Sequence, residues 1–315
     1  MQSPIPWPAG VRRKLSLWRE ELRVPFFTAT FLPILLGALI AWERGYGFQW
    51  GYFLLTLLWG TLLHAGTNVA NDYFDHLSGA DEQNYEFVRP FTGGSRMIQR
   101  RLLSPREVLV GALLFFALGS LIGLSLAYVR GWPILALGLV GVLSGFFYTA
   151  PPVRLSSRGI GELFVGLNFG ILMTLGSYYV QAQQLDLEPL WASLPLATLI
   201  AAVLYINEFQ DLPADRAADK HTLVVRLGRP RAVSGYILLM VATYGSIATA
   251  VLLGHITPFA LLALATIPIA LFAIRVARAN YEDYIRLAPA NAATVFVHLL
   301  TGILLALAYL LEGWV

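Results

Sequence analysis

The chain has 315 residues, of which 57% are hydrophobic and only 13% are charged, and its mean hydropathy is +0.63. Because soluble domains usually carry about 25% charged residues, this composition excludes an ordinary soluble enzyme and indicates an integral membrane protein. The net charge of +3 gives no argument for nucleic-acid binding, and the lack of cysteine excludes disulfides, thiolate metal sites and cysteine nucleophiles.

Residues 1–23 form a basic amphipathic lead that we expect to lie on the membrane surface. Apolar runs of about 20 residues follow, and each predicts a transmembrane helix. We place nine spans, at 24–42, 51–71, 108–128, 132–149, 160–181, 190–209, 233–253, 257–276 and 291–311. The sequence therefore predicts an all-α membrane protein, with residues 1–315 forming a single domain whose nine-helix bundle covers 24–311.

The basic residues predict the orientation of these spans. If the N-terminus lies inside, all 22 lysines and arginines except Arg44 and Arg130 fall on the inner side. Lysine and arginine concentrate in cytoplasmic loops, so we expect a cell (inner) membrane protein with a cytoplasmic N-terminus and an external C-terminus. The two longest connections, 72–107 and 210–232, are then both cytoplasmic, and long loops in compact proteins are often functional.

Two acidic stretches mark the points where spans enter these long connections. Residues 68–81 read NVANDYFDHLSGAD, and residues 207–219 read NEFQDLPADRAAD. Side chains three or four residues apart share a helix face, so the first stretch forms a polar stripe of Asn68, Asn71, Asp72 and Asp75, followed by Asp81. The second forms a stripe of Asn207, Asp211 and Asp215. We expect Pro213 to end or bend that helix and to place Asp215 and Asp219 on an irregular turn.

Crowded carboxylates repel each other unless cations neutralise them. Mg²⁺ prefers oxygen ligands and is commonly held by one or two carboxylates together with substrate phosphates. Two facing stripes therefore predict two Mg²⁺ ions, with Mn²⁺ able to substitute, and a diphosphate between them. The alternative is a pair of simple helix ends facing water, which would suit one isolated aspartate better than two matched stripes.

Basic and aromatic residues near the stripes are candidates for contact with a diphosphate. Arg96 lies in FTGGSR, where Gly93 and Gly94 allow the backbone to approach a ligand closely, and Lys220 follows Asp219 directly. Tyr148 and Arg154 lie in FFYTAPPVRLSSRG; an aromatic belt followed by ordinary inner-side charges explains that segment equally well.

Two histidines and two further asparagines lie within the predicted spans. We interpret His64 and His298 as packed, hydrogen-bonded histidines rather than ligands. We interpret Asn168 and Asn291 as polar groups that join helices in the bundle.

The two motifs resemble those of the UbiA superfamily of membrane prenyltransferases. Its N-D-x-x-D motif with a further aspartate is met by Asn71, Asp72, Asp75 and Asp81, and its D-x-x-x-D-x-x-x-D motif is met by Asp211, Asp215 and Asp219. The strings NDYFDHLSGAD, YTAPPVRLSSRGIGELFVGLNFG, GSYYVQ and DLPADRAADKHTLVVRLG are most similar to the 1,4-dihydroxy-2-naphthoate polyprenyltransferase branch of menaquinone biosynthesis.

This resemblance implies a UbiA-type bundle with cytoplasmic cap loops and a Mg²⁺-dependent reaction. A polyprenyl group would pass from an allylic polyprenyl diphosphate to an aromatic quinone precursor, here 1,4-dihydroxy-2-naphthoate, through a carbocation-like transition state. Besides these two substrates, membrane lipid is the only partner we expect, with no nucleic acid and no obligate protein partner.

The resemblance also implies roles for individual residues. The implied metal ligands are Asn68, Asn71, Asp72, Asp75, Asp81, Asp211, Asp215 and Asp219. The implied catalytic residues are Asp72, Asp75, Asp211, Asp215 and Tyr148. The implied diphosphate-binding residues are Arg96, Lys220, Arg154, Asn68 and Asn207.

Two alternatives remain open from the sequence. The acceptor could instead be 4-hydroxybenzoate, homogentisate, another naphthoate or a glycerol phosphate lipid. A cation-coupled transporter is the alternative from a different class, because intramembrane acids also mark ion pathways. The acids cluster at one face only, and no charge lies at mid-depth in the spans at 108–128, 132–149, 233–253 and 257–276, so the sequence favours the enzyme.

Overall fold

The structure is a computed structural model, described here for residues 10–314, and within that range all regular elements are helices. Eight of its helices are long and apolar enough to cross a membrane. They cover Val24–Tyr46, Trp50–Ser78, Pro105–Arg130, Gly161–Ala182, Glu188–Ala217, Arg229–Leu252, Pro258–Asn280 and Tyr284–Glu312. The prediction of an all-α, multi-pass membrane protein is confirmed.

The ninth predicted span, 132–149, corresponds to a shorter apolar helix, α5 (Trp132–Phe146). Its 15 residues reach about 22 Å, at 1.5 Å per residue, whereas the hydrocarbon core of a bilayer is about 30 Å thick. Residues 10–314 thus contain eight apolar helices of spanning length and this shorter one, in the expected order, and a count of nine full spans stays a prediction.

Some spans are built from several helical segments. The N-terminal lead contains α1 (Val11–Glu21), while its residues 1–9 lie outside the described range. The first span combines η1 (Val24–Phe27), α2 (Thr28–Ala41) and η2 (Trp42–Tyr46). The next two long helices are α3 (Trp50–Ser78) and α4 (Pro105–Arg130). After α5 and the short η3 (Leu155–Arg158), one continuous span contains α6 (Gly161–Gly166), the π-helix η4 (Leu167–Leu172) and α7 (Met173–Ala182).

The second half of the chain contains α8 (Glu188–Ala217), the short α9 (Leu223–Leu227) and α10 (Arg229–Leu252). It ends with η5 (Pro258–Thr266), α11 (Ile267–Asn280) and α12 (Tyr284–Glu312). Helix α3 packs against α4, α2 against α7, α8 against α10, and α11 against α12. The largest apolar cluster is centred on the buried rings of Tyr205, Phe209 and Tyr236.

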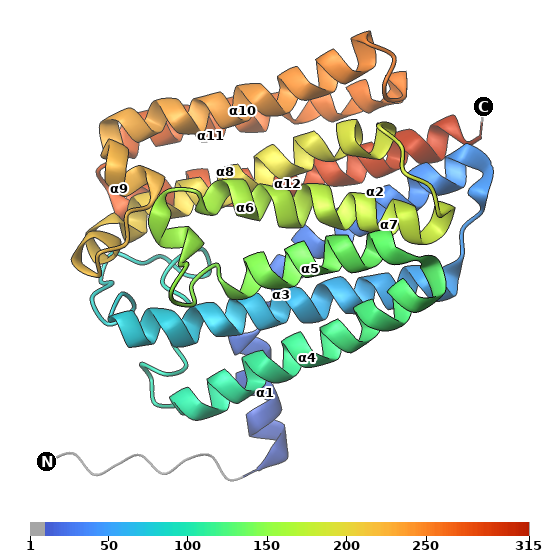
Figure 1. The fold of residues 1–315 in the computed structure, drawn as a ribbon. Coiled ribbons are helices and arrows are strands. Elements are labelled where there is room, and N and C mark those ends of the chain that lie inside the picture. Colours follow the sequence, from blue (N-terminus) through green and yellow to red (C-terminus); the bar gives the residue numbers. More distant parts are fainter. Residues whose placement is uncertain (1–9, 315) are drawn as a thin grey trace, which may run out of the picture.

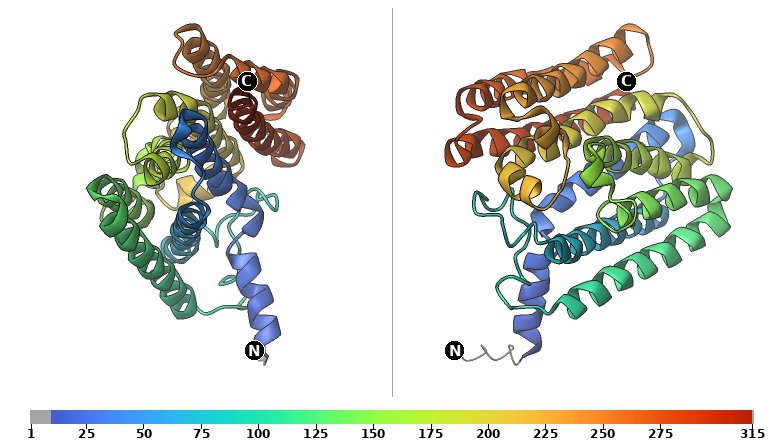
Figure 2. Two further views of the ribbon diagram at one scale, coloured as in Figure 1. Left: turned by 90° about the vertical axis from the view of Figure 1, so that its right-hand side faces the viewer. Right: turned by 60° about the vertical axis from the view of Figure 1, so that its left-hand side comes forward.

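The two acidic stretches lie at the same end of the bundle. Figure 1 shows the long helices side by side, with the loop after α3 and the segment around α9 both at the left-hand end. Helix α1 stands at a steep angle to the other helices (Figure 2), and the C-terminus lies at the right-hand end of the bundle (Figure 1). The fold therefore brings 68–84 and 207–222 together, although the helices from α4 to α7 lie between them in the sequence.

Of the two predicted effects of Pro213, the end of the helix is wrong, because α8 continues through it to Ala217, and the placement of Asp215 on an irregular turn is wrong with it. Proline cannot donate to the carbonyl four residues earlier, which here belongs to Phe209. That carbonyl accepts a hydrogen bond from Arg229 Nε at 2.9 Å instead. With the freed carbonyl satisfied, the helix continues, so Asp211 and Asp215 share one regular helix and Asp219 lies beyond its end.

Candidate active site

Two adjoining cavities open inside this end of the bundle. One is polar, has a volume of about 150 Å³ and is lined by carboxylates from both acidic stretches. The other is largely apolar, has a volume of about 250 Å³ and extends between the helices. The residues that border both cavities are Arg23, Asn71, Phe91, Tyr148, Leu204 and Asn207. A molecule with a polar head and a long apolar tail would fit across this border.

Lys220 joins the two acidic stretches at the polar cavity. Its Nζ lies 3.2 Å from Asp75 Oδ1 on α3 and 3.4 Å from Asp215 Oδ1 on α8. Burial lowers the pKa of Lys220, but Asp215 and Asp75 outweigh this effect and raise the pKa well above its usual value. The lysine therefore stays charged and offsets the repulsion between two buried carboxylates.

Asparagine side chains also hold two carboxylates that line the polar cavity, Asp211 and Asp75. Residues 79–104, which connect α3 to α4, form the cap loop. Its residue Asn84 donates from Nδ2 to Asp211 Oδ1 at 2.6 Å. Asn71 donates from Nδ2 to Asp75 Oδ2 at 3.0 Å. Asp211 and Asp75, which both line the polar cavity, are thus held in place by these amide groups.

Asp72 does not line either cavity, because Arg23 and the cap loop cover it. The Arg23 guanidinium forms an ion pair with Asp72 Oδ1, and Ser95 N donates to Asp72 Oδ2 at 3.1 Å. Burial lowers the pKa of Arg23, but Asp72 and Asp81 raise it above its usual value. Asp72 therefore fixes a charged arginine at the border of the two cavities.

The cap loop brings its backbone against these carboxylates at Gly94. This residue has a φ of 66°, and a Cβ placed on it would lie 3.0 Å from Asp72 Oδ1 and 3.3 Å from Asp81 Oδ2. Asp81 is buried at the same place, where burial and the neighbouring Asp75 and Asp72 raise its pKa well above the ordinary value. Gly94 therefore lets the cap-loop backbone approach these carboxylates, and an approach of the FTGGSR segment to a ligand stays a prediction.

Besides Asp72, three predicted site residues lie outside both cavities. Arg96 instead holds the cap loop, since its Nη1 donates to the Asp81 carbonyl at 3.1 Å and its guanidinium lies 4.4 Å from the ring centroid of Phe87. Arg154 is exposed to solvent. The side chain of Asp219 is 92% exposed and lies 3.1 Å from His221 Nε2. We therefore remove Asp219 and Arg154 from the candidate site.

The other predicted residues do meet at the cavities. Asn68 lines the apolar cavity, while Asn71, Asn207 and Tyr148 line both. Burial, followed by the nearby Glu208 and Glu162 carboxylates, raises the pKa of Tyr148 well above its ordinary value. The phenol is therefore a neutral aromatic group at the point where the polar and apolar cavities join.

The sequence interpretation missed several residues of the polar cavity. These are Arg23, Ser156, Glu208 and Thr222, together with Asn84, which holds Asp211. Arg23 comes directly before the first span, and this position is the only signal that could have distinguished it from the other arginines of the lead. Nothing in the sequence indicates that the loop residue Asn84 reaches an aspartate 127 residues away.

The donor chemistry of the polar cavity fits Mg²⁺, because its candidate ligands are the carboxylate and amide oxygens that this ion prefers. Within residues 10–314, no three acidic or histidine side chains gather closely enough to hold an ion by themselves. This arrangement suits Mg²⁺ bound by one or two carboxylates and completed by substrate phosphate oxygens, rather than an ion held by protein groups alone.

Comparison with known proteins identifies the family. The sequence matches the UbiA prenyltransferase family over residues 30–300. It is 35% identical to the 1,4-dihydroxy-2-naphthoate octaprenyltransferase of Mycobacterium tuberculosis over 222 residues, which cover 70% of this chain and 73% of the relative. It is 30% identical to the 2-carboxy-1,4-naphthoquinone phytyltransferase of a Synechocystis species over 318 residues, 99% of this chain and 97% of the relative.

Solved structures share the fold at low sequence identity. A UbiA homolog from Aeropyrum pernix superposes with a TM-score of 0.65 at 15% identity, covering 90% of this chain and 97% of that one. A UbiA homolog from Archaeoglobus fulgidus bound to DMAPP and Mg²⁺ gives a TM-score of 0.57 at 16% identity, covering 94% and 97%. The chain described here is a membrane prenyltransferase and belongs to the UbiA family.

Proposed function

We propose that this protein transfers a polyprenyl group from a polyprenyl diphosphate to 1,4-dihydroxy-2-naphthoate in menaquinone biosynthesis. The observation that carries the proposal is the pair of joined cavities: a polar one with cationic and carboxylate groups from both acidic stretches, and an apolar one between the helices. The names of the similar naphthoate prenyltransferases support this choice of acceptor.

In this proposal the diphosphate lies in the polar cavity and the isoprenoid chain in the apolar one. Lys220 and Arg23 donate to the diphosphate oxygens, which requires them to share or exchange their present carboxylate partners. Both are buried cations, and their electrostatic interaction with an anion is stronger there than in water. They thus bind the substrate and stabilise the charge that develops on the departing diphosphate.

Asn71, Asp75, Asp81, Asp211 and Asp215 would hold Mg²⁺, because these residues border the polar cavity with oxygen donors. Mg²⁺ supplies Lewis-acid stabilisation of the leaving diphosphate when it is bound. Asp72 has a different role in this proposal: it keeps Arg23 in place from outside the cavity.

Transfer breaks the C–O bond to the diphosphate, which leaves with the bonding electron pair. A ring carbon of the acceptor then forms the new C–C bond, and the ring loses a proton or its carboxylate. The Tyr148 ring lies where the allylic carbon would pass from the polar to the apolar cavity, and its face can stabilise positive charge there. The cap loop of residues 79–104 covers the polar cavity and would keep water away from the cation.

The test is a membrane assay with radiolabelled geranylgeranyl diphosphate, Mg²⁺ and four acceptors: 1,4-dihydroxy-2-naphthoate, 4-hydroxybenzoate, homogentisate and a glycerol phosphate lipid. We expect a prenylated naphthoate. A product with another acceptor alone would refute the assigned pathway while preserving the reaction class. Failure of the purified protein to bind the diphosphate would favour the transporter interpretation.

The orientation in the membrane is also part of the proposal. The cavity end of the bundle contains α1 and both long connections (Figure 1), which carry most of the basic residues. By the positive-inside tendency this end faces the cytoplasm of a cell or inner membrane. Labelling of single cysteines introduced into the cap loop and at the C-terminus, in intact cells, would test this.

A further inference from the structure

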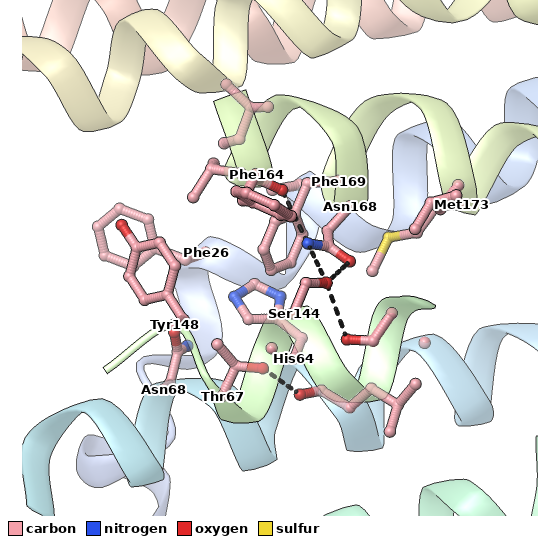
Figure 3. Close-up of a pocket in the computed structure, with 18 of the residues that line it drawn as sticks. Phe26, His64, Thr67, Asn68, Ser144, Tyr148, Phe164, Asn168, Phe169 and Met173 are labelled. Atoms are coloured by element: carbon pink, nitrogen blue, oxygen red, sulfur yellow. Dashed lines mark hydrogen bonds between the residues drawn. The ribbon is translucent and has the colours of Figure 1, made fainter. Parts of the chain in front are cut away.

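His64 is a buried histidine in the wall of the apolar cavity. Its side chain is only 6% exposed, and it projects from α3 between Tyr148 on one side and Asn168 on the other (Figure 3). Nδ1 bonds the hydroxyl of Thr30 at 2.8 Å. Within residues 10–314, the hydrogen bond of this imidazole is made by Nδ1, and none is made by Nε2. An apolar cavity wall therefore carries one open polar ring atom.

The other polar side chains at this depth already have partners in the wall. Thr67 donates to the Leu63 carbonyl at 2.9 Å, and Ser177 donates to the Ile34 carbonyl at 2.6 Å. Asn168 donates to Ser144 Oγ at 2.9 Å (Figure 3).

Two further polar side chains of the wall are Thr56 and Trp59. Thr56 donates to the Tyr52 carbonyl at 2.8 Å. The Trp59 indole nitrogen is turned towards Gly123 of α4, where a Cβ would lie 2.7 Å from it. His64 thus offers a bound molecule an unpartnered ring nitrogen, whereas Thr56, Thr67 and Ser177 already donate to carbonyls of the wall.

The chemistry of His64 separates the two substrates of the proposed reaction. An isoprenoid chain has no hydrogen-bonding group, and burying an unpaired imidazole nitrogen against it would cost free energy. A hydroxylated aromatic ring has oxygens that could pair with this nitrogen. If the Thr30 hydroxyl donates to Nδ1, the ring proton lies on Nε2, which is then a donor; in the other tautomer Nε2 is an acceptor. A phenol group can pair with Nε2 in either case.

The surroundings of His64 are aromatic on two sides. The rings of Phe169 and Phe27 lie edge-to-face, with centroids 4.5 Å and 5.1 Å from that of the imidazole. Phe169 belongs to η4, a π-helix that interrupts the span from α6 to α7, and such interruptions occur frequently at functional sites. Aromatic side chains favour a flat aromatic ligand, since offset or edge-on ring contacts stabilise it beyond area burial.

The depth of His64 also fits an acceptor. His64 precedes Asn68 by about one helical turn, which is a rise of about 6 Å along α3. The rise from His64 to Asn71 is about 10 Å. Asn71 borders the polar cavity where the diphosphate would lie. A bicyclic ring with one oxygen on Nε2 would reach back along this interval and bring its far edge near the allylic carbon.

We propose that His64 binds an oxygen substituent of the aromatic acceptor through Nε2 and thereby orients the ring for prenylation. This inference rests on the proposed function and names the acceptor-binding group within it. The apolar remainder of the cavity, around Leu137, Leu172 and Met173, is left for the isoprenoid chain.

The test compares wild type with His64→Leu and His64→Gln. Leucine removes the hydrogen bond while filling similar space, and glutamine restores a polar group at a similar distance. Each protein is assayed with 1,4-dihydroxy-2-naphthoate and with its two analogues that lack either the 1-hydroxyl or the 4-hydroxyl. His298→Leu is the matched control, because His298 is also buried within a span but does not line the cavity.

For His64→Leu we expect kcat/KM for the acceptor to fall about tenfold or more, while the Kd for the polyprenyl diphosphate changes by less than about twofold. Wild type should discriminate against one analogue more strongly than His64→Leu does, by about tenfold, because the variant has no hydrogen bond left to lose. His64→Gln should recover part of the loss, and His298→Leu should match wild type in acceptor kinetics.

If wild type and His64→Leu discriminate between the acceptor and each analogue by the same factor, the assignment is overturned. So would a loss in His64→Leu that falls on diphosphate binding, or one that His298→Leu reproduces. If wild type prenylates naphthoates, these results refute His64 alone. If wild type prenylates no aromatic acceptor, the proposed function fails and the inference fails with it.

Discussion

Replacing Lys220 with methionine tests the electrostatic design of the polar cavity. The side chain is only 14% exposed, and its ammonium lies 3.2 Å from Asp75 Oδ1 and 3.4 Å from Asp215 Oδ1. At an effective dielectric constant of about 20, each contact corresponds to an attraction of roughly 5 kcal/mol before the cost of desolvation. Removing one partner of a buried ion pair typically costs about 3–5 kcal/mol, since the other charge stays buried and unpaired.

We therefore expect Lys220→Met to lose about 3–5 kcal/mol of unfolding free energy in metal-free buffer. Mg²⁺ should restore part of this loss, because a cation that binds only the folded protein stabilises it. The KM for the polyprenyl diphosphate should rise as well. Unfolding by SDS titration from a mild detergent, with and without Mg²⁺, measures the first two effects, and the membrane assay measures the third.

Lys14→Met is the matched control. Lys14 also forms an ion pair, 2.6 Å from Glu107 Oε1, but it is 52% exposed. An exposed pair contributes less than about 1 kcal/mol, so this variant should remain close to wild type in stability and KM. If Lys220→Met is no less stable than Lys14→Met without metal, or if Mg²⁺ leaves the gap between them unchanged, the reasoning is refuted.

Three further predictions follow from the site. Gly94→Ala should lose most activity, because its Cβ would enter the carboxylate cluster. Gly79→Ala is the control: Gly79 also has a positive φ, but a Cβ there meets only a side-chain atom of Gln83 at 3.4 Å. This variant should share the backbone strain of about 1 kcal/mol and retain activity. Asp211→Asn keeps an oxygen for Asn84 but removes the charge, so kcat should fall at least about 100-fold with little change in stability. Full chelation of divalent metal should abolish wild-type turnover. Substantial activity in either experiment would contradict the metal site. Burial, and after it the nearby Asp72, raises the pKa of Glu21 from an ordinary 4.5 to about 8. Its contribution to stability is therefore complete below pH 4.5 and is lost as the pH rises towards 8. Glu21→Gln should show a smaller fall in unfolding free energy over that interval, and a pH profile like that of wild type would contradict this prediction.

The sequence by itself determined the class of the protein and the identity of its acidic motifs. Apolar runs of membrane-spanning length leave few alternatives to helices, because backbone groups in lipid must be satisfied within the segment. Local spacing was also sufficient to align Asn71 with Asp75, which form a hydrogen bond one turn apart on α3. Such features depend on neighbours within a few residues, and the sequence displays them directly.

Local patterns failed where a distant side chain changed the outcome. Pro213 should end a helix on its own, but α8 continues because Arg229 satisfies the carbonyl of Phe209. Arg154 and Arg23 are equally basic in the sequence; only packing exposes the first and buries the second against Asp72.

The functional arrangement of charges was decided only by tertiary structure. Lys220 reaches Asp75 across 145 residues, and Asn84 reaches Asp211 across 127. His64 looked like any packed histidine until its helix, the π-helix of Phe169 and the hydroxyl of Thr30 were placed around it, with Nε2 left open. A cavity consists of the space between helices, and no single helix contains the information on which of its polar atoms a neighbouring helix will satisfy.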